Sequence, residues 1–131
     1  VGVFLNSGSR YETDATSGVA HFAEHLLFKS TKTQTQEAME REIENMGGHI
    51  NAYTSREQTA YFAKVFRQDV PRAIEILADI LQNAKFDPDA VEREREVILR
   101  EAAEVGKIAE EVIMDNLHET AYQGSGLGRT I

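Results

Sequence analysis

The hydrophobic positions of this chain follow a strand pattern in three stretches. Residues 1–5 form a short apolar run of the kind found in buried strands. Residues 49–54 and 59–66 are rich in β-branched and aromatic side chains, and a polar break at residues 55–57 separates them. A break of this length and composition suits a hairpin. The pattern therefore predicts three strands, the last two of which pair with each other.

Two helices are expected before the hairpin. Thr16 or Ser17 can cap the first one, which follows a loop rich in polar residues. Thr33 and Gln36 have the spacing of a capping box at the start of the second helix. Gly47-Gly48 is expected to end that helix, because glycine tolerates the backbone conformation of a helix C-terminus.

Apolar residues at helical spacing predict further helices after the hairpin. One starts at residues 69–71, where Pro71 suits a first turn, and another starts at Asp87-Pro88 and runs to Val105. Gly106 interrupts the pattern before a last helical stretch at residues 108–122. The apolar face expected for the helix after the hairpin consists of Ile74, Leu77, Ile80 and Leu81. Together these elements predict an α+β domain of two layers, with helices packed on a mainly antiparallel sheet.

Length and composition limit the possible classes. The 131 residues suffice for one domain with a core, and the absence of cysteine excludes disulfides and thiolate metal ligands. No apolar run approaches the about 20 residues of a membrane-spanning helix, so no transmembrane segment is expected. The chain starts with Val1 and stops shortly after a glycine-rich stretch, and we expect both ends to be cut from something longer.

The acidic residues are concentrated in the second half of the chain. The formal net charge is −8, and residues 87–119 hold eleven acidic against four basic side chains. No basic stripe is available to neutralise phosphates, so nucleic acid is disfavoured as a partner. The acidic stretch favours a basic ligand on electrostatic grounds, although a solvated helix face has the same composition.

The sequence His21-Phe22-Ala23-Glu24-His25 is the strongest chemical signal. At about 100° per residue, the two histidines lie one turn apart on the same helix face. Two imidazoles so placed can bind one Zn²⁺, and the neighbouring Glu24 can accept a proton from water. This H-x-x-E-H order is the inverse of the H-E-x-x-H zinc peptidase motif. The motif predicts a zinc metallopeptidase.

Catalytic zinc usually has three protein ligands, so one more is needed. Glu94 and Glu101 are seven residues apart on one face of the acidic helix. Glu101 is flanked by Leu99 and Ala102, which suggests a carboxylate turned toward the core. Glu104 lies one turn further on and remains an alternative. The full set of candidate carboxylates on this helix is Glu92, Glu94, Glu96, Glu101 and Glu104.

Three separated blocks resemble one family in order and spacing. Residues 18–31, 51–58 and 92–101 together resemble the pitrilysin-type inverzincins, and within them the β-type mitochondrial processing peptidases. The resemblance continues through residues 117–122 and 127–131. It implies that residues 1–131 are part of the N-terminal zinc-binding domain of such a peptidase, with later domains absent.

The resemblance also implies roles for individual residues. His21, His25 and Glu101 match the three zinc ligands of the family, and Glu24 matches its general base. Glu94 matches a second family glutamate that supports the site.

Further matches concern the substrate. Phe28 falls where the family forms a pocket for an aromatic residue just after the cut, and Glu111 and Asp115 fall where an arginine two residues before the cut is recognised. Asn51 and Ala52 lie on a strand whose exposed edge is expected to pair with an extended substrate.

The implied function is removal of basic N-terminal presequences from imported precursor proteins. The resemblance implies Zn²⁺ as cofactor, a heterodimer with a glycine-rich α subunit, and the mitochondrial matrix as location. The main alternative is a structural core subunit of the respiratory cytochrome bc complex, which has the same fold. A module that binds basic helical peptides without cutting them and a bacterial peptidase of broader activity are further alternatives.

Overall fold

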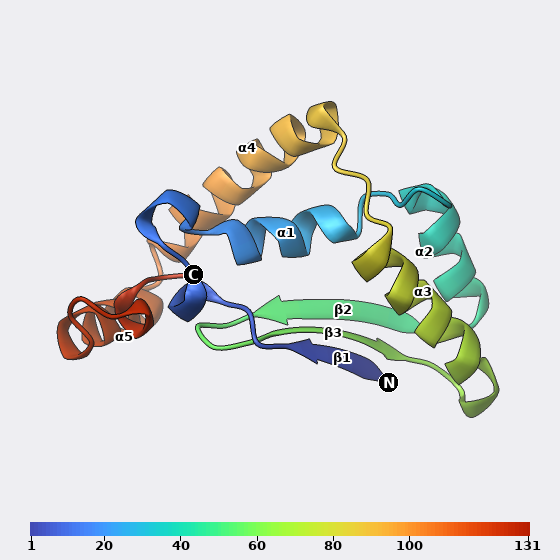
Figure 1. Cartoon of the computed structure of the whole chain (residues 1–131), viewed down its shortest axis with the longest axis horizontal. Coiled ribbons are helices and arrows are strands. Elements are labelled where there is room, and N and C mark those ends of the chain that lie inside the picture. Colours follow the sequence, from blue (N-terminus) through green and yellow to red (C-terminus); the bar gives the residue numbers. More distant parts are fainter.

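Three antiparallel strands form one sheet, and helices cover one of its faces (Figure 1). The computed structural model describes all 131 residues, Val1–Ile131. The strand order is β1-β3-β2, so β1 and β2 are the two edges. The expected α+β fold with an antiparallel sheet is confirmed. The elements are β1 Gly2–Leu5, α1 Val19–Leu27, α2 Gln36–Asn45, β2 His49–Thr54, β3 Thr59–Lys64, α3 Val70–Gln82, α4 Pro88–Val105 and α5 Ala109–Ala121.

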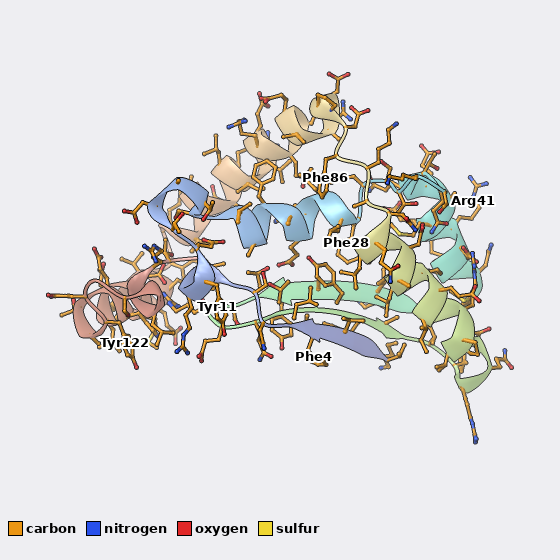
Figure 2. The ribbon with its side chains drawn as sticks, viewed as in Figure 1. Phe4, Tyr11, Phe28, Arg41, Phe86 and Tyr122 are labelled. Carbon is orange, nitrogen blue, oxygen red and sulfur yellow. The ribbon has the colours of Figure 1, made fainter.

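The register of the sheet separates a packed face from a bare one. Tyr61 on β3 lies opposite Val3 and Ala52, and its buried ring packs against Phe28 at the end of α1. Phe4 is one residue out of phase and 66% exposed. Figure 2 shows Phe28 between the helices and the sheet and Phe4 on the other side. The core cluster consists of Leu27, Met39, Ile43, Tyr61, Ala63, Ala73, Ile76, Leu77 and Ile80.

The buried face of α3 differs from the expected one at one position. Ile74 is 49% exposed, whereas Ile76 is almost fully buried. The residues that contact the sheet follow the spacing of one helix face, Ala73, Ile76, Leu77 and Ile80. Ile74 lies outside that stripe, because it is about 100° from Ala73 around the helix axis.

The N-terminus of α1 is capped by a residue other than those expected. The N-cap position is Gly18, in a left-handed conformation with φ 82°, and neither Thr16 nor Ser17 caps the helix. The buried Glu12 carboxylate accepts hydrogen bonds from the N–H groups of Gly18 at 2.7 Å and Ala20 at 2.9 Å. A carboxylate at this end of a helix satisfies free donors and is favoured by the helix dipole.

The second expected cap and the end of β3 are also shifted. Thr35, not Thr33, caps α2, and its hydroxyl accepts a hydrogen bond from the N–H of Ala38. The Thr33 hydroxyl instead donates to Asp79 on α3 at 2.6 Å. β3 was expected to reach residue 66, but it ends at Lys64, which pairs with His49, the first residue of β2.

The last two helices are arranged differently from the first three. α4 passes over α1 on the side away from the sheet, and α5 lies at one end of the molecule (Figure 1). Glu94 is the only buried residue of α4, and α5 has none. No helix combines the length and the apolar composition that a membrane-spanning segment requires.

Candidate active site

The two histidines of the motif meet on the face of α1 that is turned toward α4. Ala20, Leu26 and Leu27 are the buried residues of α1. Their burial leaves the opposite face for His21 and His25, which are half-buried. The two Nε2 atoms are 3.1 Å apart, and the rings meet edge to face with centroids 4.7 Å apart. The helical spacing therefore brings both ring nitrogens to one point.

Glu101 completes the group from α4. Its Oε2 lies 3.3 Å from the Nε2 of His25 and 3.8 Å from the Nε2 of His21. One ligand atom from each of the three residues lies within 4.8 Å of the others. Glu104, the alternative left open by the sequence, instead pairs with Lys107 on the exposed side of α4. The structure thus groups Glu101 with the histidines.

The geometry of these three residues fits a zinc ion. Nitrogen and oxygen ligands bind zinc at about 2.0–2.2 Å, so neighbouring ligand atoms of a tetrahedral site lie roughly 3.3 Å apart. The observed separations of 3.1, 3.3 and 3.8 Å surround this value. The Glu101 side chain is 47% exposed, which leaves the site accessible to water and a substrate.

Glu94 contacts His25 at Nδ1, the ring nitrogen that does not face His21. Its Oε1 lies 2.9 Å from His25 Nδ1, and its Oε2 lies 2.8 Å from Lys29 Nζ. Burial alone would raise the pKa of Glu94, but the hydrogen bonds and charges of Lys29 and His25 outweigh it and lower that pKa. An ionised Glu94 only accepts, so His25 donates from Nδ1, and its other ring nitrogen, Nε2, faces His21 and Glu101.

The carboxylate that faces the interior differs from the expected one. The sequence placed Glu101 toward the core, but Glu94 is the residue that is buried, with a side chain only 7% exposed. Leu99, one of the apolar neighbours that suggested burial, is itself 64% exposed. The reason is that α4 packs on the polar face of α1. The residue of α4 that is buried there must pair with charged or polar side chains, and a carboxylate does so where an apolar residue would not.

Glu24 is oriented by the end of β2. Its Oε2 accepts a hydrogen bond from the Thr54 hydroxyl. Burial, together with the charge of Glu24, raises the pKa of Tyr61 above its ordinary value, so Tyr61 keeps its proton. Thr54 was not singled out from the sequence, and its position at the end of a strand gave no signal of this contact. Thr54 does lie within residues 51–58, one of the three blocks that carry the family resemblance.

A hollow of about 290 Å³ lies beside Phe28. Phe28 and Asn51 both line it, so the structure brings these two predicted residues together. Ala52 faces the core side of the sheet, and its N–H donates a hydrogen bond to the side-chain oxygen of Asn51 at 2.8 Å. The free edge of β2 is thus locally covered by Asn51. The remaining lining residues are Met39, Glu40, Ile43, Glu44, Gly48, His49 and Ile50.

The two acidic residues expected to bind an arginine, Glu111 and Asp115, have different partners in the structure. Glu111 is exposed and makes no ion pair within the chain. Asp115 already binds an arginine of this chain, because Arg56 in the β2–β3 turn donates to its Oδ1. Thr130 donates to its other oxygen at 2.8 Å. Arg56 was missed in the sequence, where it was read only as part of a polar turn.

A model of the insulinase family, peptidase family M16, matches residues 1–131, the whole chain. The chain belongs to this family. The resemblance recognised in the three sequence blocks is therefore confirmed.

Named relatives of this M16 chain agree with the match. It is 61% identical to a mitochondrial-processing peptidase subunit beta of Neurospora crassa and 58% identical to the human one, over 131 residues in both cases. It is also similar to the crystal structure of a protease from Helicobacter pylori, with a TM-score of 0.73 and 34% identity over 76% of this chain and 24% of that one. The chain spans 28% of the Neurospora relative and 27% of the human one.

Proposed function

We propose that this chain is part of the N-terminal zinc-binding domain of a metalloendopeptidase that removes basic presequences from proteins imported into mitochondria. One observation carries the proposal, the convergence of His21, His25 and Glu101 beside a Glu24 that Thr54 orients. The relatives named as processing-peptidase β subunits support the substrate class and the mitochondrial matrix as location. Their designation as a subunit supports a heterodimer, for which we propose the glycine-rich α partner.

The residues of the chain divide the chemistry among themselves. Zn²⁺ held by His21, His25 and Glu101 would acidify water and polarise the scissile carbonyl. Glu24 accepts the proton of the attacking water and delivers it to the leaving amine. The Thr54 hydroxyl keeps the Glu24 carboxylate in place during both transfers.

The edge of β2 gives the substrate a direction. Glu24 contacts Thr54, the last residue of β2. The hollow beside Phe28 lies near the first residues of β2, and α5 contacts the turn that follows the last residue of β2. A substrate whose arginine precedes the cut and whose aromatic residue follows it therefore runs antiparallel to β2. Its backbone would displace the Asn51 side chain from the N–H of Ala52 and pair with the strand edge.

A purely structural role in the respiratory cytochrome bc complex accounts for the geometry of the site less well than peptidase activity does. Such a subunit needs neither three converging ligand atoms nor a carboxylate oriented beside them. Membership of that complex is nonetheless compatible with peptidase activity, so the experiment below tests the activity itself.

The test replaces Glu24 by glutamine in the native-length protein assembled with its partner. We expect cleavage of a presequence peptide to fall by about 10²–10⁴-fold, because the proton acceptor is lost. Zinc content should stay unchanged, since Glu24 is not one of the three converging ligands. Glu96→Gln, at an exposed position of α4, is the matched control and should leave both quantities unchanged. Appreciable cleavage by zinc-loaded Glu24→Gln protein would overturn the proposal.

A further inference from the structure

We infer that Glu12 is a positioning residue of the metal site, because its carboxylate holds the first turn of α1 and thereby sets the position of His21. This inference rests on the proposed function, since it concerns the geometry of the same three converging residues. It gives a role to a buried carboxylate that lies outside the H-x-x-E-H motif and outside the sequence blocks that carry the family resemblance.

The two histidines of the site are held in different ways. His25 is fixed at both ring nitrogens, since its Nδ1 contacts Glu94 at 2.9 Å and its Nε2 faces His21. The polar contacts of the His21 ring all go through Nε2, which lies 3.1 Å from His25 Nε2 and 3.8 Å from Glu101 Oε2. No side chain outside the ligand group orients His21 as Glu94 orients His25. The position of His21 therefore depends on the backbone of the first turn of α1.

The first turn of α1 has no acceptor of its own for its free N–H groups. α1 has only nine residues, and its N-cap is Gly18, which makes no side-chain cap. The first N–H groups of any helix have no partner within the helix, so a short helix frays easily at this end. Fraying would displace His21, because it is the third residue of α1.

Glu12 supplies acceptors for two of these N–H groups. Its Oε2 accepts a hydrogen bond from the N–H of Gly18 at 2.7 Å, and its Oε1 accepts one from the N–H of Ala20 at 2.9 Å. Ala20 directly precedes His21 in the chain. Glu12 is only 8% exposed, so water has little access to replace either bond. The helix dipole also favours a carboxylate at this end of α1.

The loop that carries Glu12 is itself attached to two other segments. The N–H of Arg10 donates to the carbonyl of Arg56, in the turn that follows β2, at 2.9 Å. The hydroxyl of Ser9, a residue that is 1% exposed, donates to the carbonyl of Arg129 at 3.2 Å. Figure 1 shows the C-terminal end of the chain beside this loop. Glu12 is therefore a fixed point, and α1 is the element that it orients.

α1 is tied to the end of the β2–β3 hairpin at two points. Its N-terminus is attached through Glu12 and the loop before it, and its middle is attached through Glu24, which accepts a hydrogen bond from Thr54. Two attachments limit both the tilt and the rotation of a helix. Loss of the first attachment should let His21 move, whereas Glu24 and His25 keep their own partners.

The test measures the metal site directly, in the native-length protein assembled with its partner. Glu12→Gln keeps one acceptor but turns an amide NH₂ toward the second N–H group. We expect it to lower zinc affinity about tenfold, as measured by competition with a chelator, because the support of one ligand is weakened. The visible d–d absorption bands of the cobalt-substituted protein should also shift, since they report the geometry around the metal.

Hydrogen exchange of the metal-free protein supplies a readout that needs neither metal nor activity. We expect the amides of residues 18–22 to exchange about tenfold faster in Glu12→Gln, as when one hydrogen bond of the turn is lost. Glu12→Ala removes both acceptors, so its loss of zinc affinity should be larger, about 100-fold. The graded effect shows how far the conservative change to glutamine preserves the site.

Thr35→Ala is the matched control, because it removes a helix cap from α2, away from the ligands. It should leave zinc affinity, the cobalt bands and the exchange of residues 18–22 unchanged. Should Glu12→Ala fail to fold, the comparison of Glu12→Gln with Thr35→Ala decides.

Two results would overturn the inference. Unchanged zinc affinity and cobalt bands in Glu12→Gln, together with a lowered Tm, would show that the carboxylate only stabilises the fold. An equal loss of affinity in Thr35→Ala would show that the effect follows overall stability and not the position of His21. A wild-type protein that binds zinc but cleaves no presequence peptide would contradict the proposed function, whereas affinity and cobalt bands would still test Glu12.

Discussion

α3 and α5 have the same length, thirteen residues each, but are attached to the molecule in different ways. α3 buries Ala73, Ile76, Leu77 and Ile80 against the sheet, whereas α5 buries no residue. α5 instead packs on the short 3₁₀ turn Gly126–Gly128, and its Asp115 pairs with Arg56. The difference shows that a helix of this domain is placed either by apolar burial or by a few charged contacts.

The largest effect should come from removing apolar contact under α3. Leu77 is 1% exposed, so Leu77→Ala should lower the free energy of unfolding by about 3 kcal/mol through lost burial and a cavity. Urea unfolding monitored by circular dichroism measures this change. A loss below about 1 kcal/mol would contradict the view that α3 is held by burial.

α4 lies between the two cases, because its one buried residue is the carboxylate of Glu94. Glu94→Gln removes the charge that orients His25 and pairs with Lys29. We expect zinc affinity to fall by about 10–100-fold, as measured by competition with a chelator. Glu92→Gln on the exposed side of the same helix is the control, and an equal loss there would show a general effect of charge.

A smaller loss of stability is expected from Asp79, a charged residue that ties α3 to the loop before α2 in addition to the buried apolar residues of the helix. Asp79 accepts hydrogen bonds from Thr31, Thr33 and Asn83. Burial would raise the pKa of Asp79, but these bonds outweigh it and hold that pKa below its usual 3.8. Asp79→Asn should therefore lower the free energy of unfolding by roughly 2 kcal/mol at neutral pH.

The pH dependence of that loss follows from the sign of the shift. Because the folded-state pKa of Asp79 is lowered, its stabilisation is fully present above pH 3.8 and disappears as the pH falls through the folded-state pKa. Urea unfolding at several pH values should show the wild type and Asp79→Asn converging in acid. A gap that stays constant down to pH 2 would contradict the role of the ionised carboxylate.

The smallest effect is expected on the apolar surface of α5. Leu117 is 56% exposed, so Leu117→Ala should change the free energy of unfolding by less than about 0.5 kcal/mol. Urea unfolding beside Leu77→Ala makes the comparison directly. A loss as large as that of Leu77→Ala would mean that α5 is held by apolar burial after all.

The sequence predicted the features that depend on periodicity. β-Branched and aromatic content on either side of a polar break predicted the hairpin and its two strands, helical spacing and capping residues predicted the five helices, and the H-x-x-E-H order placed two imidazoles at one point. Features that depend on contacts between distant segments were not predictable in the same way. The Glu12 cap of α1, the Thr54–Glu24 bond and the Arg56–Asp115 pair each join residues that no local pattern connects.

The wrong expectations have the same origin. Thr33 has the spacing of a helix cap, but Asp79 of a later helix takes its hydroxyl. The role of Asp115 in binding a substrate arginine stays a prediction, and in the structure its carboxylate accepts a hydrogen bond from Arg56 of the chain itself. The roles of His21, His25 and Glu101 as zinc ligands stay predictions, which the geometry supports.

Zinc stoichiometry tests the central claim most directly. We expect about one zinc per chain in the purified protein by elemental analysis, as for a site of three protein ligands. Glu101→Gln should weaken that binding, whereas Glu104→Gln, at a position paired with Lys107 one turn away, should not. Equal zinc in the wild type and Glu101→Gln, or loss of zinc only in Glu104→Gln, would contradict the assignment of the site to His21, His25 and Glu101.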